Sequence, residues 1–373
     1  MFKVSKRVFL IIALVLSLVL LVGCSQEKTE TEAGFVTLKY ATKFKIENLA
    51  DDCKKVTDGE GRELLLVPRG QEVPSMYRDL PVINTPVEQV VVLSATQAAL
   101  LRPLDELGSI IAVTTEKEHW YIDEVKEGLE SGKVQLVGSG MGPVDYDKIV
   151  ALKPDVVFMS TASAEDLEKL RKLEELKIPV AVDNEWLEND PLGRMEWVKF
   201  LAAFYGKGEK ADDIFNNAVK KTEEIGKKVA EAKAQPKVLW GMIWEGKVYV
   251  PGGDSYVAKM IELAGGDYLF EDKKGEGTIT LEEFYARGEE ADIYISSTLP
   301  NYGVTSIAKI IEQGKVLADL KTIKEGKVWC FQPWFYQVLD KTDEMITDLA
   351  TIFHPELFPN AELKQFMKLP KAD

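Results

Sequence analysis

The sequence predicts an α/β protein with two lobes that are joined by one long helix. Three observations predict this fold class: short apolar strands alternate with helices over residues 85–190, the alternation stops over 191–234, and it restarts at Lys237. Alternating strands and helices form parallel sheets that are covered on both faces. The length of 373 residues is sufficient for two such lobes.

The N-terminal segment has the pattern of a targeting signal. A basic start precedes an apolar run, Val8 to Val22, that is short for a membrane span and suits a signal peptide. The run ends in Leu-Val-Gly-Cys24, which resembles the lipobox of lipoproteins. We expect a signal peptide over 1–23, a lipidated Cys24, a polar tether over 24–34, and an extracytoplasmic protein lipid-anchored to the cell membrane. The alternative is an uncleaved membrane anchor.

An N-terminal lobe is expected over residues 35–190. It begins with strands from Phe35 to Pro68, where Asp58-Gly59 indicates a β-hairpin that elaborates the lobe. Val90 to Leu93 is a buried strand, and Ser94 with Gln97 forms a capping box that opens the next helix, which we expect to close at Gly108. The later elements are expected as strands at 110–113, 134–137, 155–159 and 180–182 and as helices at 145–152 and 164–176.

A helical bridge is expected over 191–235 and a C-terminal lobe over 236–373. Apolar residues from Ala211 to Val229 recur at three- and four-residue spacing, which is one face of a long amphipathic helix within 210–234. Pro236 is expected to end this helix. The second lobe then has strands at 237–244, 247–250, 293–296 and 327–331 and a helix at 256–263.

Composition limits the classes of function. The formal charge of −15 argues against nucleic acid as a partner, because phosphate binding needs a basic face. Two histidines argue against a histidine-rich metal site, and three cysteines exclude a disulfide scaffold. Whether Cys53 and Cys330 pair is left open. The sequence has no G-x-S-x-G, P-loop or H-E-x-x-H motif that would indicate an enzyme.

A weak internal repeat relates the two lobes. The segment from Asp147 to Asp155, DKIVALKPD, is similar to the segment from Glu282 to Asp292, EEFYARGEEAD, and each precedes an apolar strand that ends in Ser/Thr. The two copies fall at similar places in the two lobes, so Asp147 and Glu282 are expected at equivalent positions.

Several motifs resemble the substrate-binding lipoproteins of ABC importers that capture iron complexes, haem and cobalamin. The resemblance covers about residues 85–359 and rests on VVVLSATQAALLRPLDELG, VGSGMGPVDYDKIVALKPDVVF, MIELAGGDYLF and TITLEEFYARGEEADIYI. It implies the class III periplasmic-binding fold, with two Rossmann-like lobes, and an ABC permease dimer with its ATPase as partners. It also implies permease docking through Asp147, where the family usually has Glu, and Glu282.

The ligand is expected in the cleft between the lobes, beyond the carboxyl ends of the strands. The aromatic, His and Met side chains that follow these strands, including five of the seven tryptophans, are the candidate ligand-binding residues: His119, Trp120, Tyr121, Met141, Trp186, Trp240, Trp244, Trp334 and Tyr336. Flat indole rings suit a large planar ligand. The alternative for each tryptophan is a place in the hydrophobic core.

The expected cargo is a metal that arrives already chelated, and no resident cofactor or protein metal site is expected. No arginine follows the strands, which disfavours anionic catecholate chelates and favours haem, a corrinoid such as cobalamin, or a neutral or cationic siderophore. Two other readings stay open: a surface enzyme or chelatase that acts on a tetrapyrrole with the same fold, and a sensor or scaffold lipoprotein.

Overall fold

A computed structural model describes residues 34–140, 142–275 and 277–372. The predicted signal peptide, Cys24, most of the tether and Met141 lie outside the described residues. Within the part that is described, no helix is both long and apolar enough to cross a membrane.

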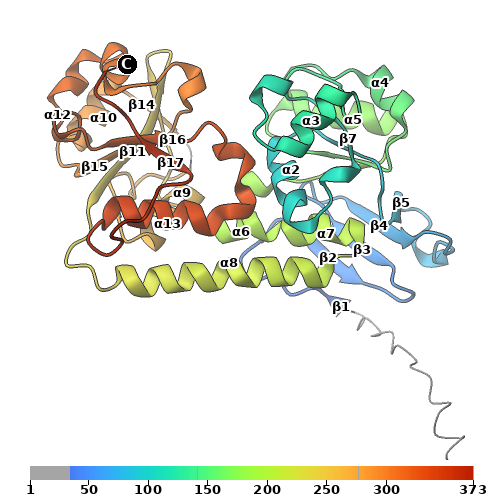
Figure 1. The fold of residues 1–373 in the computed structure, drawn as a ribbon. Coiled ribbons are helices and arrows are strands. Elements are labelled where there is room, and N and C mark those ends of the chain that lie inside the picture. The colour runs from blue at the N-terminus through green and yellow to red at the C-terminus, as the bar shows by residue number, and fades with distance from the viewer. Residues whose placement is uncertain (1–33, 141, 276, 373) are drawn as a thin grey trace, which may run out of the picture. The chain divides into compact units, whose positions relative to one another are not determined.

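The N-terminal lobe contains a parallel sheet with the strand order β10-β9-β6-β7-β8 (Figure 1). Its strands are β6 (Val90–Val92), β7 (Ile110–Val113), β8 (Gln135–Leu136), β9 (Val156–Met159) and β10 (Val180–Val182). The helices between them are α2 (Ala95–Leu101), α3 (Asp123–Ser131), α4 (Tyr146–Leu152) and α5 (Ala164–Glu175). The central strands β6 and β9 are buried along their whole length, as their continuous apolar runs predict.

The capping box of Ser94 and Gln97 is present at the start of α2. The prediction that this helix runs to Gly108 is wrong, because the α-helix ends at Leu101. The 3-10 turn η3 (Arg102–Leu104) follows it directly, and Gly108 lies in a separate 3-10 turn, η4 (Leu107–Ser109). Pro103 explains the early end, since it lacks the N–H that the helix needs and its ring clashes with the preceding turn.

A separate five-stranded sheet precedes this lobe. It has the order β1-β2-β3-β4-β5, with strands β1 (Gly34–Phe35), β2 (Lys45–Asn48), β3 (Lys54–Thr57), β4 (Glu63–Pro68) and β5 (Val82–Thr85). The predicted hairpin is confirmed, because β3 and β4 pair antiparallel across the Asp58 turn. Asp58 closes this turn by accepting hydrogen bonds from the N–H groups of Glu60 and Arg62 at 3.0 Å each. The elaboration is therefore a full sheet rather than one hairpin.

Three helices connect the two lobes: α6 (Pro191–Glu196), α7 (Val198–Tyr205) and α8 (Gly208–Val229). Figure 1 shows α8 running along both lobes. Its buried face carries Ala211, Phe215, Ala218, Thr222 and Ile225, which follows the predicted spacing. The helix ends at Val229, well before Pro236, so the proline does not terminate it.

The C-terminal lobe contains a mixed sheet with the order β14-β12-β11-β15-β16-β17, and β13 pairs with β11. Its strands are β11 (Lys237–Trp244), β12 (Lys247–Val250), β13 (Asp267–Tyr268), β14 (Gly277–Ile279), β15 (Ile293–Ser296), β16 (Val328–Phe331) and β17 (Phe366–Lys368). Its helices are α9 (Tyr256–Leu263), α10 (Leu281–Gly288), α11 (Ile307–Gln313), α12 (Lys321–Glu325) and α13 (Thr342–Phe353). The parallel centre of this sheet, β11-β15-β16, repeats the architecture of the first lobe.

Cys53 and Cys330 are both buried and unpaired. Burial raises the pKa of the Cys330 thiol to about 12, and burial together with Asp51 and Asp52 raises the pKa of Cys53. Neither thiol is therefore a reactive group at neutral pH.

Asp348 of α13 holds the C-terminal strand in place. Its carboxylate accepts hydrogen bonds from the backbone N–H groups of Lys364, Gln365 and Phe366, at 2.7, 2.6 and 3.1 Å. Burial, with a smaller contribution from Glu344, raises the pKa of Asp348 from its ordinary 3.8 to about 6 and outweighs these three donors.

This pKa predicts a pH-dependent stability. The pKa of Asp348 is higher in the folded protein than in the unfolded chain. Its contribution to stability is therefore fully present below the unfolded pKa of 3.8 and is lost as the pH rises from there through about 6. We expect the wild type to lose about 3 kcal/mol of unfolding free energy over this window relative to Asp348→Asn, which does not titrate. Urea denaturation of both proteins at several pH values measures the difference, and parallel pH profiles would contradict the prediction.

Candidate functional site

A pocket of about 910 Å³ lies between the two lobes. This volume is within the range of about 300–1,000 Å³ that is typical of small-molecule sites. The first lobe contributes segments that follow β6, β7 and β8, and the second lobe contributes β11, β12 and segments that follow β15 and β16. The pocket therefore lies at the carboxyl ends of the parallel strands, where ligands of open α/β sheets bind. We call it the interlobe pocket.

The segment after β7 forms much of the first lobe's wall. His119 is exposed and lines the interlobe pocket together with Tyr121. The hydroxyl of Tyr121 accepts a hydrogen bond from Asn301 Nδ2 of the other lobe at 3.3 Å. The ring of Tyr121 also meets Trp334 edge to face, with 5.9 Å between their centroids.

The second lobe's wall is aromatic. Trp244, the last residue of β11, is 45% exposed and meets the ring of Tyr302 edge to face at 6.5 Å. Tyr249 and Tyr336 also line the pocket. Sequence reasoning missed Tyr249 and Tyr302. Tyr302 follows β15, so the rule of listing residues beyond each strand would have found it.

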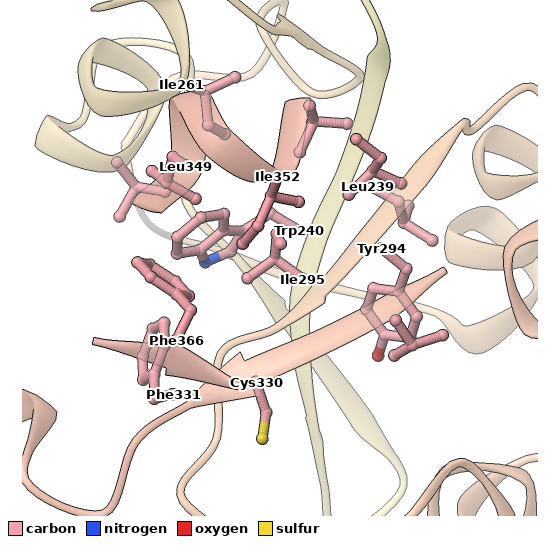
Figure 2. Close-up of a cluster of buried hydrophobic side chains, with 14 of the residues drawn as sticks. Leu239, Trp240, Ile261, Tyr294, Ile295, Cys330, Phe331, Leu349, Ile352 and Phe366 are labelled. Atoms are coloured by element: carbon pink, nitrogen blue, oxygen red, sulfur yellow. The ribbon is translucent and has the colours of Figure 1, made fainter. Parts of the chain in front are cut away.

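Two of the predicted cleft tryptophans are instead core residues, which corrects the expectation that their rings face the ligand. Trp120 is 2% exposed, and its indole N–H donates to the carbonyl of Thr115 at 2.9 Å. Trp240 is 1% exposed and packs in the core of the C-terminal lobe against Phe331 and Phe366 (Figure 2). Trp240 lies in the middle of β11, opposite Ile295, whereas Trp244 ends the strand and reaches the pocket.

Trp186 and Trp334 are not in the described lining of the interlobe pocket, and Trp334 is adjacent to it through its contact with Tyr121. Trp186 follows β10, the edge strand of its sheet, and the described lining draws on segments after β6, β7 and β8. Trp334 lines a second cavity of about 680 Å³, which shares Tyr121 and Gln337 with the interlobe pocket. Three cationic residues also line this second cavity: Arg102, Lys341 and Lys364.

The lining of the interlobe pocket carries little charge. Its described residues include one acidic residue, Glu116, and one histidine, His119, and they include neither an arginine nor a lysine. In the described part of the chain, no group of three or more His, Cys, Asp or Glu side chains is arranged to hold a metal ion. The pocket offers aromatic faces, phenol groups, one imidazole and one carboxylate to a ligand.

Asp147 and Glu282 take equivalent positions in the two lobes. Both are exposed and stand in the first turn of a helix, α4 and α10 respectively. The two copies of the internal repeat also end in aspartates that make the same hydrogen bonds. The backbone N–H of Asp155 donates to the carbonyl of Gln89, the residue before β6, and the carboxylate of Asp155 accepts from the N–H of Gln89 at 3.1 Å. Asp292 makes the same two hydrogen bonds with Lys237 at the start of β11.

Two α/β lobes, linking helices and a pocket between the lobes are the features of an extracytoplasmic solute-binding protein of an ABC transporter. A model of the periplasmic binding protein family matches residues 90–332. The chain therefore belongs to the periplasmic binding protein family, whose members bind solutes without acting as enzymes and work with permease and ATPase components.

The chain is similar in sequence to a curated relative and in fold to solved structures. The uncharacterized lipoprotein MJ0878 of Methanocaldococcus jannaschii is 35% identical over 331 residues, covering 84% of this chain and 78% of that protein. The molybdate periplasmic binding protein MolA of Haemophilus influenzae aligns with a TM-score of 0.61 at 16% identity, over 83% of this chain and 94% of that one. The periplasmic haem-binding protein RhuT of Roseiflexus sp. RS-1 aligns with a TM-score of 0.58 at 16% identity, over 72% of this chain and 99% of that one.

Proposed function

We propose that this protein captures a large, mainly apolar metal chelate between its lobes and delivers it to an ABC permease. The cargo is haem, a corrinoid such as cobalamin, or a neutral or cationic siderophore. The observation that carries this proposal is an interlobe pocket with an aromatic wall and no basic residue in its described lining. Anionic catecholate chelates need arginine or lysine partners, which this lining does not offer.

The polar groups of the pocket suit the same cargo. The exposed phenol of Tyr336 and the imidazole of His119 are the groups that can approach a chelated metal from the two opposite walls. Trp244, Tyr249 and Tyr302 supply flat apolar faces for the organic part of the chelate. The proposed cargo keeps its chelator throughout, which agrees with the lack of a cluster of metal ligands among the described residues.

Delivery completes the proposal. Asp147 and Glu282 present one exposed carboxylate from each lobe to basic sites of the permease dimer. Lipidation of Cys24 keeps the protein at the membrane, and the relative named a lipoprotein supports this part. A single acyl chain holds a protein only weakly, so stable anchoring requires at least two.

Titration with haemin and with cobalamin, followed by tryptophan fluorescence, tests the proposal. We expect one of the two chelates to quench the emission with a stoichiometry of about one per chain. Replacing Trp244 with Leu is expected to weaken this binding about tenfold, because an exposed ring that faces the ligand is lost. Trp329→Leu is the matched control, since Trp329 lies on β16 and is not in the described lining of the pocket.

The third arm of this experiment uses a ferric catecholate siderophore, for which we expect no saturable quenching. A response to this chelate, together with flat titrations for haemin and cobalamin, would overturn the proposed ligand class.

A further inference from the structure

A buried glutamine of the C-terminal lobe bonds to the backbone of the N-terminal lobe. Gln337 lies in the 3-10 turn η9 (Phe335–Gln337) and is 6% exposed. Its amide nitrogen donates to the carbonyl of His119 at 2.7 Å, and its amide oxygen accepts from the N–H of Tyr121 at 2.8 Å. Both polar groups of the side chain are thus used by one short segment of the opposite lobe.

A charged pair fixes the same turn of the chain. The guanidinium of Arg102 donates to the carboxylate of Asp340 through Nε at 3.0 Å and Nη2 at 2.5 Å. Nη2 also donates to the backbone carbonyl of Gln337 at 3.1 Å. Arg102 belongs to the first lobe and Asp340 to the second, so Gln337 is held at its backbone as well as at its amide.

The position of this contact relates it to the ligand. His119 and Tyr121, the two residues that the amide bonds, line the interlobe pocket. Tyr121 and Gln337 also line the second cavity, so these two residues lie between the second cavity and the interlobe pocket. The positions of the His119 and Tyr121 rings in the pocket therefore depend on the hydrogen bonds between the Gln337 amide and their backbone.

We propose that Gln337 is a positioning residue, which fixes the His119–Tyr121 segment against the C-terminal lobe and thereby sets the first lobe's wall of the ligand pocket. A side-chain amide can donate and accept at once, as this segment requires. Glutamate of the same shape cannot donate to the carbonyl of His119, and methionine does neither. The effect of Gln337 on ligand binding rests on the proposed function, whereas its effect on the position of the His119–Tyr121 segment does not.

Hydrogen–deuterium exchange of the full-length protein tests the effect on the segment. We expect Gln337→Met to speed exchange of the Tyr121 amide at least about tenfold, because the acceptor is removed. Gln337→Glu keeps an acceptor for the Tyr121 amide but places a second carboxylate oxygen beside the carbonyl of His119. We expect a smaller increase in the exchange rate of the Tyr121 amide in this variant. Exchange in the core strands β6 and β15 should stay at the wild-type rate, which separates a local effect from general destabilisation.

Gln332→Glu is the matched control, since Gln332 lies in the same segment and its side-chain amide donates to the carbonyl of Phe366, in its own lobe, at 3.5 Å. Unchanged exchange at Tyr121 in Gln337→Met, or an equal increase in the control, would overturn the proposal.

Dissociation of haemin, measured by transfer to a haem-scavenging protein, tests the effect on the ligand. We expect release to be about tenfold faster from Gln337→Met than from the wild type or Gln332→Glu. Faster exchange at Tyr121 with an unchanged release rate would refute a role in ligand positioning. If the wild type binds cobalamin and not haemin, release of cobalamin is compared in the same variants. Failure of the wild type to bind either chelate would instead count against the proposed function, and the exchange result would still decide whether Gln337 holds the segment.

Discussion

Replacing Asp147 or Glu282 with arginine will reduce uptake of the cargo by about 100-fold or more, while its affinity for the purified protein stays unchanged. Both carboxylates are exposed and take equivalent positions on α4 and α10. Under the proposed function each meets a basic site of the permease, so a reversed charge places like charges together. Uptake of labelled chelate by cells that carry each variant as their sole copy measures the effect.

The controls separate docking from folding. An arginine in the first turn of a helix costs about 0.3–1 kcal/mol, which is too little to unfold a lobe. Glu168→Arg, an exposed charge reversal on α5, should leave uptake unchanged. Asp147→Glu keeps the charge on a side chain one methylene longer and should support uptake at least as well as the wild type. Loss of ligand affinity in either arginine variant would contradict the docking role.

Replacing Glu196 with alanine will lower the free energy of unfolding by about 3–5 kcal/mol. Its buried carboxylate accepts hydrogen bonds from the backbone N–H groups of Lys39, Tyr40 and Ala41 at 2.9, 2.8 and 2.9 Å. It also pairs with Lys199 at 3.2 Å. The substitution leaves these three N–H donors, of which that of Ala41 is buried, without their acceptor, and it leaves Lys199 with Asp212 as its carboxylate partner at 2.9 Å. Urea denaturation measures the loss.

Glu223→Ala is the comparison for this variant. Glu223 pairs with Lys39 at 3.6 Å, but both side chains are exposed, so its removal should cost less than about 1 kcal/mol. A Glu196→Ala protein as stable as Glu223→Ala would show that the N-terminal segment contributes little to the fold.

The regular elements of both lobes could be predicted because their signals are local. The apolar run at Val90–Val92, the capping box of Ser94 and Gln97, and the buried face of α8 each depend on residues that are close in the sequence. The repeat that placed Asp147 and Glu282 is also local, since each copy spans one helix and the strand after it.

The site was predicted only in part, because its geometry depends on residues far apart in the sequence. A list of residues beyond each strand found His119, Tyr121, Trp244 and Tyr336, but it could not tell which way an indole points. Trp120 turns inward to a carbonyl of its own loop. The contacts of Gln337 with His119, and of Glu196 with Lys39, join positions 218 and 157 residues apart, and no local pattern indicates either.

The N-terminal sheet has a mechanical consequence. The described structure begins at β1, which pairs with β2 through two residues. In the segment after β1, the backbone N–H of Ala41 donates to Glu196 and that of Thr42 donates to Glu188. A pull on the N-terminal end would peel β1 away easily and then load these two carboxylates. Force from that end would thus be borne first by Glu188, which precedes α6, and by Glu196, which ends it, and neither residue is in the described lining of the ligand pocket.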